Sequence, residues 1–419
     1  MRITIPYGSG TVGFDIPAGS PTAVLAPRPA TPAADARAEI RRALDAPIAA
    51  GPLAAAVAGA RSVVILADDL TRQTPSHLII PALLDELNAS GLRDEQCSVL
   101  IALGTHRPMT EAEIRAHYGP EVATRVRVVN SPWQDPGQMV DLGVTPNGTP
   151  ISIARAALAA DFLIGLGSIV PHHIPGFSAG AKIVQPGISG AETTGATHLF
   201  SVRSRRSYLG LVDNPVRAEM ELIAERAGLR AIFNVVLDTK GRLVRAFYGD
   251  PRAAHRAGVA VAAEVYGVPL PGQADIVIAG SHPCDIEFWQ AHKSLYPADL
   301  AVRTGGTVIV VTPAPEGVSV SHREMLNFTA LPAERIDAAI ADGTLTNVVS
   351  AALALAWAKM RERANILLVS DGISADEARA LGFTPHPSVQ DALAAALRVH
   401  GAGASINVLP YAPETLPLA

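Results

Sequence analysis

Cysteine is scarce in this chain of 419 residues, which contains only Cys97 and Cys284. Two cysteines cannot form the disulfide framework that is typical of small secreted proteins. The N-terminal residues also lack the long apolar core of a secretion signal. The sequence therefore predicts a cytoplasmic protein.

Long hydrophobic runs and runs of basic residues are absent as well. Charged residues interrupt or flank the apolar stretches around 151–170 and 348–360, so neither stretch is expected to span a membrane. The net charge is −5, and no cluster of Lys and Arg resembles a nucleic-acid-binding surface. These absences exclude membrane and nucleic-acid partners and leave small molecules as the expected ligands.

What the sequence contains instead is a repeated pattern of a short apolar run, a polar cluster and a helix. Continuous apolar strands that alternate with helices are typical of parallel sheets covered on both faces. We therefore predict an α/β fold with two domains, because a chain of this length is too long for one ordinary core. The predicted strands are 62–67, 98–103, 126–129, 162–167, 232–237, 275–280, 307–312 and 365–370.

The predicted domain boundary lies in the Pro- and Gly-containing segment at residues 266–273, which precedes a new strand. Residues 1–268 are expected to form an N-terminal catalytic and cofactor-binding domain. Residues 269–419 are expected to form a C-terminal domain that contributes substrate-binding residues. Each domain should contain a mainly parallel sheet flanked by helices.

The N-terminal region is expected to lie outside this repeated pattern. Residues 1–16 alternate like a pair of strands around a glycine-containing turn. Residues 17–35 are rich in Pro and Ala and are expected to form a surface loop.

Polar clusters follow the predicted strands. In an open parallel sheet, the carboxyl ends of the strands meet at one edge, and ligands bind there. We therefore expect one active site in the cleft between the two domains. The clusters are DDLTR (68–72), GTHR (104–107), GSIVPHH (167–173), SHPCD (281–285) and SDG (370–372).

Two histidines in these clusters, His106 and His172, are candidate acid/base residues. Histidine takes up and releases a proton near neutral pH, so two of them could serve opposite faces of one small molecule. The alternative is that each ring only forms a hydrogen bond to its own loop. Both histidines follow a strand end close to a glycine, which makes the two interpretations about equally good.

Lys182 lies in the segment GFSAGAK, whose small residues allow a ligand to approach the backbone closely. The spacing is not that of a P-loop, G-x-x-x-x-G-K-[ST]. The segment could hold a phosphate through its backbone N–H groups, or Lys182 could be a nucleophile toward a cofactor. A solvated lysine on a flexible loop is the third interpretation.

His198 is predicted to lie two turns into a helix that begins at a capping box formed by Ser189 and Glu192. One histidine is a weak metal signal, because closed zinc sites need several ligands, and the sequence contains neither Cys-x-x-Cys nor His-Glu-x-x-His. A metal ion at His198 would therefore take most of its ligands from a group other than protein side chains.

Four further polar residues are candidates for ligand binding. Arg72 is suited to bidentate capture of a carboxylate, and Asp69 could orient Arg72 or hold a sugar hydroxyl. Gln290 and Lys293 are three residues apart, on one face if their segment is helical. A surface ion pair and a solvated helix face are the respective alternatives.

Taken together, these motifs resemble the lactate racemase family, whose members use a nickel-pincer nucleotide. The motifs occur in the family's order and the match covers most of the chain. They are DDLTR, GTHRPMT, PHHIPGFSAGAKIVQPGISG, the TH at 197–198 and the WQAHK run.

The resemblance implies how the cofactor is held. The cofactor is a pyridinium mononucleotide joined to a lysine, and its two sulfurs and one ring carbon bind nickel. By position, Lys182 would be the attachment residue and His198 the remaining nickel ligand. Ser178 and Gly180 would also contact the cofactor, and Asp69 would lie near its ribose or near the substrate.

The resemblance also implies an isomerase that inverts the Cα centre of a 2-hydroxy acid. His106 and His172 would be the two acid/base residues, and Arg72, Gln290 and Lys293 would hold the substrate. One histidine would remove the hydroxyl proton while hydride leaves Cα for the cofactor. The other would protonate the oxygen after the planar 2-keto acid has turned and taken the hydride back. Proteins that synthesise the cofactor are implied as partners.

One feature departs from the family pattern. Family members commonly carry more glycine around the lysine, whereas Ala179 and Ala181 flank Gly180 here. An added methyl is tolerated where φ is negative, but it narrows the room beside the cofactor. The sequence does not indicate a role for His173, the preferred 2-hydroxy acid or the oligomeric state. Two alternatives remain open: a metal or Schiff-base lysine enzyme without the pincer, and a nucleotide-binding or carrier protein without racemase activity.

Overall fold

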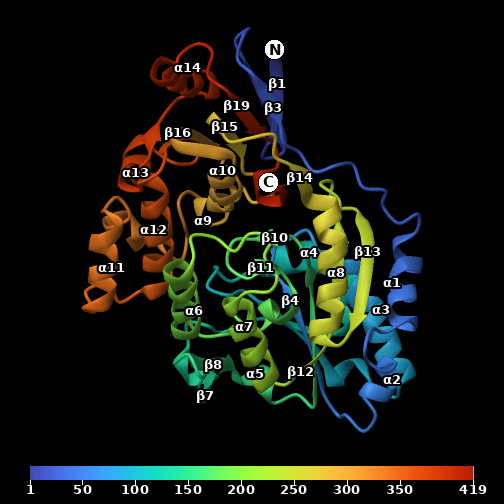
Figure 1. Ribbon diagram of the computed structural model, residues 1–419. Helices are drawn as coiled ribbons and strands as arrows, with labels where there is room; N and C mark the ends of the chain where they lie inside the picture. Colours follow the sequence, from blue (N-terminus) through green and yellow to red (C-terminus); the bar gives the residue numbers. More distant parts are fainter. Residues whose placement is uncertain (419) are drawn as a thin grey trace.

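Every apolar run predicted to be a strand lies in one of two six-stranded sheets. In the computed structural model, which describes residues 1–418, each sheet forms the centre of one α/β domain, and the second domain lies above the first in Figure 1. The first sheet is parallel except for one edge strand, and the second is parallel throughout. The predicted α/β fold with mainly parallel sheets is confirmed.

The first sheet has the strand order β13-β12-β9-β4-β5-β6. Buried aliphatic side chains on both faces explain why these strands are continuous apolar runs. The strands are β4 (Val63–Asp68), β5 (Cys97–Ala102), β6 (Arg127–Asn130), β9 (Phe162–Ser168), β12 (Leu229–Leu237) and the antiparallel edge strand β13 (Leu243–Gly249).

Helices cover both faces of this sheet. One face packs against α1 (Ala36–Asp45), α2 (Leu53–Ala56), α3 (Ser76–Ala89) and α4 (Glu111–Arg125). The other face packs against α7 (Pro215–Arg226) and α8 (Pro251–Tyr266), with α5 (Arg155–Leu158) and the hairpin β7 (Met139–Val144)–β8 (Pro150–Ala154) at the lower end in Figure 1.

The second sheet has the strand order β18-β17-β16-β15-β19-β3. Its strands are β15 (Ala274–Gly280), β16 (Val302–Val311), β17 (Asn365–Val369), β18 (Thr384–Pro385), β19 (Ile406–Leu409) and β3 (Thr22–Val24). One face packs against α9 (Phe288–Ala291), α10 (Leu295–Ala301), α11 (Ala333–Ala341), α12 (Val348–Arg361) and α13 (Ala375–Ala380). The other face packs against α14 (Val389–His400).

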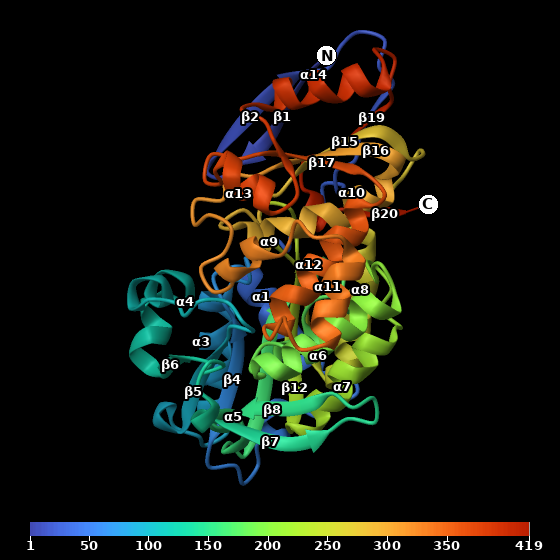
Figure 2. The same ribbon diagram turned by 90° about the vertical axis from the view of Figure 1, so that its left-hand side faces the viewer.

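The N-terminal region packs on the second sheet rather than on the first. The predicted pair of strands is present as β1 (Arg2–Tyr7) and β2 (Gly10–Asp15), whose apolar side chains share a core with α14. The prediction of a surface loop for residues 17–35 is wrong in part, because β3 hydrogen-bonds to β19 as an edge strand. The first residues of the chain thus lie with the second sheet, although the predicted boundary at residue 268 groups them with the first domain (Figure 2).

The strand order of each sheet indicates where along its carboxyl edge a ligand can bind. In the first sheet β5 and β9 lie on opposite sides of β4, and in the second β16 and β19 lie on opposite sides of β15. Such points, where the strand order reverses, leave a crevice at the carboxyl ends of the strands. The loops after β4, β5, β9 and β15 contain candidate residues.

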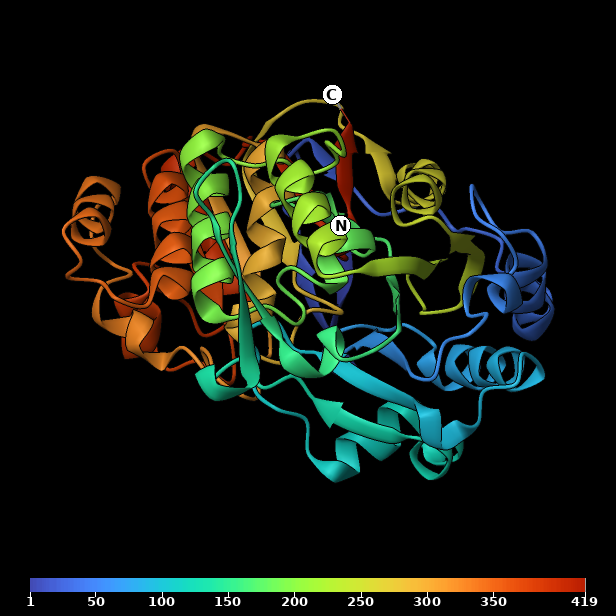
Figure 3. The same cartoon turned by 90° about the horizontal axis from the view of Figure 1, so that it is seen from below.

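One helix pair joins the two domains. The helix α6 (Ala191–Ser204) of the first domain lies beside α12 of the second, seen as a green and an orange helix in Figure 3. The two helices approach closely at Gly195, where an added Cβ would lie 2.9 Å from Cβ of Val348. None of the described helices is long and apolar enough to cross a membrane.

Candidate active site

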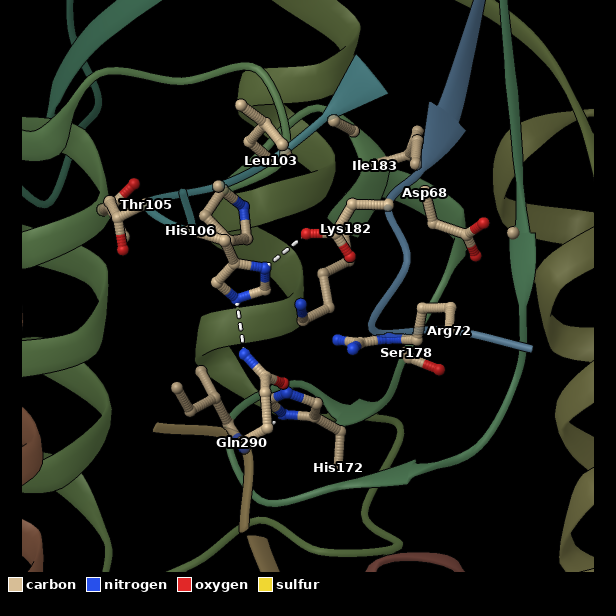
Figure 4. A pocket seen from close by; sticks show the side chains of 18 of the residues that line it. Asp68, Arg72, Leu103, Thr105, His106, His172, Ser178, Lys182, Ile183 and Gln290 are labelled. Atoms are coloured by element: carbon tan, nitrogen blue, oxygen red, sulfur yellow. Dashed lines mark hydrogen bonds and ion pairs between the residues drawn. The ribbon is translucent and has the colours of Figure 1, made fainter. Parts of the chain in front are cut away.

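One cavity lies where the loops of the two domains meet. It contains about 840 Å³ of empty space, which includes space that is open to solvent. The predicted site residues that line it are Asp69, Arg72, His106, His172, Ser178, Lys182, His198, Gln290 and Lys293. Figure 4 shows Lys182, Arg72 and His106 pointing toward its middle.

Gly180 is the exception among the predicted residues, because it lies behind the cavity wall. Its N–H donates to Oδ1 of Asn234 at 3.0 Å, and an added Cβ would lie 2.8 Å from the ring of His255. Ser178 lines the cavity, but its hydroxyl donates to the carbonyl of Ser168 at 2.6 Å. Both residues stabilise the conformation of the loop. The N–H of Gly180 and the hydroxyl of Ser178 already donate hydrogen bonds within the protein, so neither is a free donor for a ligand.

His106 follows β5 and is held at both ring nitrogens. Its Nδ1 lies 2.6 Å from Oδ2 of Asp69, and its Nε2 lies 2.8 Å from the amide nitrogen of Gln290. Lys293 donates to the amide oxygen of Gln290, which leaves the amide nitrogen to donate to His106. The hydrogen-bond network therefore assigns the proton of neutral His106 to Nδ1 and a lone pair to Nε2 (Figure 4).

Asp69 is buried with only 3% of its surface exposed, so the interpretation as a surface ion pair is wrong. Burial alone would raise the pKa of its carboxyl, but the charge and hydrogen bond of His106, together with Arg72, lower the pKa well below its ordinary value. Its second oxygen accepts hydrogen bonds from the backbone N–H and the hydroxyl of Thr71. Asp69 is thus an ionised partner that orients the His106 ring.

His172 lies on a short hairpin formed by β10 (Pro171–His172) and β11 (Gly176–Phe177). The hairpin requires glycine at position 176, where φ is +83° and an added Cβ would lie 2.1 Å from the carbonyl oxygen of Leu211. Nδ1 of His172 accepts a hydrogen bond from the N–H of Ile174 at 3.2 Å, which assigns the proton of the neutral ring to Nε2. Burial, followed by the charge of Lys182, lowers the pKa of His172 well below its ordinary value.

Lys182 lies in the 3₁₀ helix Gly180–Ile183, at the wall of the cavity. Burial and the positive charges of Arg72 and Lys293 lower the pKa of its amine well below the ordinary lysine value. No hydrogen bond joins Nζ to another residue within 1–418. The interpretation as a solvated lysine on a flexible loop is therefore wrong, and the amine has a lowered pKa and is directed at the cavity.

A buried arginine, Arg217, stabilises the loop that precedes Lys182. Arg217 of α7 exposes 1% of its surface and donates to the carbonyl groups of Pro175, Phe177 and Ala179. Burial lowers the pKa of Arg217 to about 9. These bonds satisfy carbonyl groups that the short hairpin leaves without strand partners.

Ala179 has a backbone conformation that alanine rarely adopts. Its φ is +58° and its ψ is −161°, a region that is essentially confined to glycine. The condition of negative φ under which an added methyl is tolerated is therefore not met at Ala179. Ala181 is not among the residues with positive φ. The lysine loop thus stores backbone strain at one of its two alanines.

His198 lies two turns into α6, as predicted, but the predicted capping box is wrong. The helix begins at Ala191 with Gly190 as its N-cap residue, because the hydroxyl of Ser189 donates to the carbonyl of Val184 instead. Nδ1 of His198 lies 2.7 Å from the carbonyl oxygen of Thr194, four residues earlier in the helix. A carbonyl can only accept, so Nδ1 carries the proton and Nε2 retains a lone pair.

The pKa of His198 is lowered to about 4 by burial and by the charge of Lys182. A neutral imidazole with a free Nε2 is suited to metal binding. Among residues 1–418, however, no group of three or more His, Cys, Asp and Glu side chains is arranged to hold a metal ion. His198 can therefore supply one ligand of a metal ion but not a complete site.

The second domain contributes Gln290 and Lys293 from the segment after β15. Gln290 lies in α9 and is 1% exposed, and Lys293 lies in the adjoining 3₁₀ helix His292–Ser294. Burial and the charge of Arg72 lower the pKa of Lys293 to about 8. The interpretation as a solvated helix face is wrong, because both side chains point into the cavity wall rather than into solvent.

The lining residues that were not predicted include Asp68, Trp289 and His292. Oδ2 of Asp68 accepts a hydrogen bond from Thr74 at 2.6 Å, Oδ1 has no partner, and burial raises the pKa of the carboxyl to about 7. Each of these three residues is a direct neighbour of a predicted one. Position within the same motif was the only signal that could have identified them.

Two family models match this chain and identify its known relatives. The lactate racemase N-terminal domain matches residues 7–210, and the lactate racemase C-terminal domain matches residues 271–412. The lactate racemase of Lactiplantibacillus plantarum is 32% identical over 376 residues, which is 88% of either chain. The lactate racemase of Thermoanaerobacterium thermosaccharolyticum is 28% identical over 416 residues, covering 98% of this chain and 97% of the relative.

Solved structures agree with these relatives. The lactate racemase apoprotein from T. thermosaccharolyticum superimposes with a TM-score of 0.89 at 27% identity and covers all of both chains. A protein from Thermotoga maritima has a TM-score of 0.72 at 20% identity, covering 90% of this chain and 96% of its own, and shares the fold. Fold, cavity and relatives define an isomerase of the racemase class. The chain belongs to the lactate racemase family.

The strain at Ala179 predicts an unusual response to glycine. Glycine at position 179 avoids a backbone conformation that costs alanine about 1–3 kcal/mol. This gain offsets the loss of the methyl contact and the higher conformational entropy of the unfolded chain. We expect Ala179→Gly to change the free energy of unfolding by less than about 1 kcal/mol or to increase it. Ala181→Gly, the matched control, should lower it by about 1–2 kcal/mol. Urea denaturation measures both, and equal destabilisation by the two variants would contradict the strain.

The lowered pKa of the Lys182 amine predicts selective acylation at neutral pH. An ordinary exposed lysine loses about tenfold in reactivity for each pH unit below its pKa of about 10.4. We expect trace acylation by acetic anhydride at pH 7, in cofactor-free protein, to modify Lys182 in preference to the exposed Lys240. Peptide mass spectrometry measures the ratio. A ratio at or below one would mean that the amine is charged or inaccessible.

Proposed function

We propose that this chain is a racemase or epimerase that inverts the Cα centre of a 2-hydroxy acid, lactate or a close analogue. The observation that carries the proposal is the meeting of two histidines in different tautomers with a lysine amine of lowered pKa in one cavity. The neutral His106 ring has a lone pair at Nε2 and can act as a base, whereas the neutral His172 ring has its proton at Nε2 and can act as an acid after it takes up a second proton. The names of the two relatives support lactate as the first substrate to test.

We further propose that the cavity holds a nickel-pincer nucleotide. The residues fit such a group, because His198 supplies one metal ligand and no protein cluster within 1–418 supplies the others. Lys182 would hold the nucleotide through its amine, and the side of the cavity near Asp68 and Asp69 would face its ribose. When bound, the group would accept a hydride from the substrate Cα and return it.

Substrate binding is assigned to three side chains that carry positive charge or hydrogen-bond donors. Arg72 donates only to Thr71 of its own loop, so its guanidinium retains donors for a carboxylate. Lys293 and Gln290 approach from the second domain. A bound carboxylate would offset the mutual repulsion of Arg72, Lys182 and Lys293, which gives a 2-hydroxy acid a favourable electrostatic environment.

His106 would take the hydroxyl proton of one enantiomer. Asp69 accepts the hydrogen bond from Nδ1–H and stabilises the positive charge that forms on the ring. The substrate hydroxyl would replace the amide of Gln290, which occupies Nε2 in the present arrangement. Gln290 would then be released to bind a substrate oxygen.

His172 would act on the oxygen when the opposite face of Cα is presented. When His172 takes up a second proton, that proton lies on Nδ1. Nδ1 then can no longer accept the 3.2 Å hydrogen bond from the N–H of Ile174. That contact and burial both favour the neutral ring before substrate binds. The negative charge of a bound carboxylate would raise the proton affinity of His172 and allow it to alternate with His106.

The proposal is tested with protein produced together with the cofactor-synthesis proteins. We expect about one nickel ion per chain, a mass increase that maps to the peptide containing Lys182, and interconversion of D- and L-lactate or a related acid. Lys182→Ala provides the matched control, in which the mass increase should be absent. An unmodified, nickel-free wild-type chain that still binds nucleotide would support a carrier protein and contradict the proposal.

Loss of either proposed acid/base residue should stop racemisation without removing the metal. Because such proton transfer contributes about 10²–10⁴-fold, we expect His106→Gln and His172→Gln each to lower kcat by at least 100-fold while nickel content stays unchanged. His386→Gln, at a histidine beside β18 and outside the cavity, is the control and should retain activity. Near-normal turnover by either cavity variant would reject the two-histidine scheme.

A further inference from the structure

A stack of three aromatic rings joins His172 to the second domain. The rings of His172 and His173 are 4.7 Å apart and nearly parallel, with an angle of 13° between their planes. The other face of His173 lies 3.6 Å from the ring of Tyr296 in α10, at an angle of 3°. Tyr296 belongs to the second domain, so the stack crosses the domain interface beside the cavity.

His173, the middle ring of this stack, and Tyr296 are held by packing rather than by hydrogen bonds. Nε2 of His173 and the hydroxyl of Tyr296 are buried and have no hydrogen-bond partner within the described chain. His173 is 7% exposed and Tyr296 is 2% exposed. Their contribution to the cavity therefore comes from their ring faces.

A second pair of aromatic residues fixes the stack from the side. The ring of His292 meets His173 edge-on at 5.3 Å and Tyr296 edge-on at 5.6 Å. Nδ1 of His292 accepts a hydrogen bond from the indole N–H of Trp357 in α12 at 3.3 Å. Edge-to-face and offset arrangements such as these are the favourable geometries of aromatic pairs. The second domain thus restrains His173 in two directions.

We infer that His173 and Tyr296 are positioning residues, which set the plane of the His172 ring from the second domain. The inference rests on the proposed catalytic role of His172. That ring has one hydrogen bond, from Ile174 at 3.2 Å, which restrains its edge but leaves rotation about that edge open. The parallel face of His173 restrains this rotation. The inference gives a reason for the second histidine, for which the sequence indicated no role.

The second domain holds His106 and His172 through different kinds of contact. The second domain reaches His106 through a hydrogen bond, from Gln290 at 2.8 Å, and Asp69 fixes the opposite nitrogen. His172 has no carboxylate partner, and the second domain acts on it through His173, whose ring stacks on both His172 and Tyr296. A displacement of about 1 Å at a reacting group can cost about 100-fold in rate, so a loosened ring should be measurable in kcat.

Four variants separate the ring faces from the polar atoms. His173→Leu and Tyr296→Leu remove an aromatic face, whereas His173→Phe and Tyr296→Phe keep a face and remove only nitrogen or hydroxyl groups that have no partners. In cofactor-loaded protein, we expect each Leu variant to lower kcat by about tenfold or more with KM changed less than threefold. The Phe variants should stay within about threefold of wild type in kcat.

A second measurement does not depend on activity. In cofactor-free protein with ¹³C-labelled histidine, the Hε1 resonance of His172, assigned with His172→Gln, should show the upfield ring-current shift of a stacked proton. The resonance should move toward the random-coil position in His173→Leu and remain in place in His173→Phe. Thermal unfolding identifies any variant that fails to fold. If His173→Leu fails to fold, the kcat and the His172 resonance of Tyr296→Leu test the inference instead.

The outcomes divide clearly. Equal loss of kcat in the Leu and Phe variants would mean that the nitrogen or hydroxyl atoms matter, and it would overturn the inference. Unchanged kcat or an unchanged His172 resonance in the Leu variants would overturn it as well. A loaded wild-type protein that racemises no 2-hydroxy acid would contradict the proposed function. The His172 resonance would then still test the stack by itself.

Discussion

The burial of a lysine amine among other cations is the constraint on which the site depends. Lys182 faces Arg72 and Lys293 across one cavity, and Asp69 is the ionised carboxylate among them. Charged amines are unfavourable in such surroundings, so burial and the neighbouring cations lower the pKa of Lys182. The same surroundings attract anions. The cavity thus combines a nucleophilic amine with a binding site for negatively charged molecules.

The two domains divide the remaining tasks. The first supplies Asp69 and His106 after neighbouring parallel strands, and it supplies the hairpin that carries His172. The second supplies Gln290 and Lys293, whose hydrogen bonds continue the chain of contacts from Asp69 through His106. Neither domain alone contains this chain of contacts. The site is therefore complete only when the carboxyl ends of the two sheets face each other.

Much of the fold follows from local sequence patterns. Eight apolar runs predict the central strands, because a strand buried on both faces must be apolar throughout. The short strand β3 was missed, because three half-exposed residues after a proline carry no such pattern and pair only through the backbone. The N-terminal pair of strands was predicted, but its position on the second sheet depends on side-chain packing between distant segments.

The composition of the site was more predictable than its hydrogen bonding. Strand-end clusters contain four of the nine predicted lining residues, Asp69, Arg72, His106 and His172, because the fold brings such ends together. The pairing of Asp69 with His106 joins different strands, and the bond between Ser189 and Val184 replaces a cap that the sequence favours. The conformation of Ala179 depends on contacts of the whole loop. Such features are set by tertiary structure and leave no local signal.

The central claim is that His106 and His172 move only the oxygen-bound proton of the substrate, while the Cα hydrogen is transferred as hydride and returned. Racemisation of a single enantiomer in D₂O, followed by NMR or mass spectrometry of the product, tests this claim most directly. The account predicts that the inverted product retains protium at Cα. Deuterium at Cα in proportion to inversion would mean that a histidine removes a proton from carbon, and it would contradict the account.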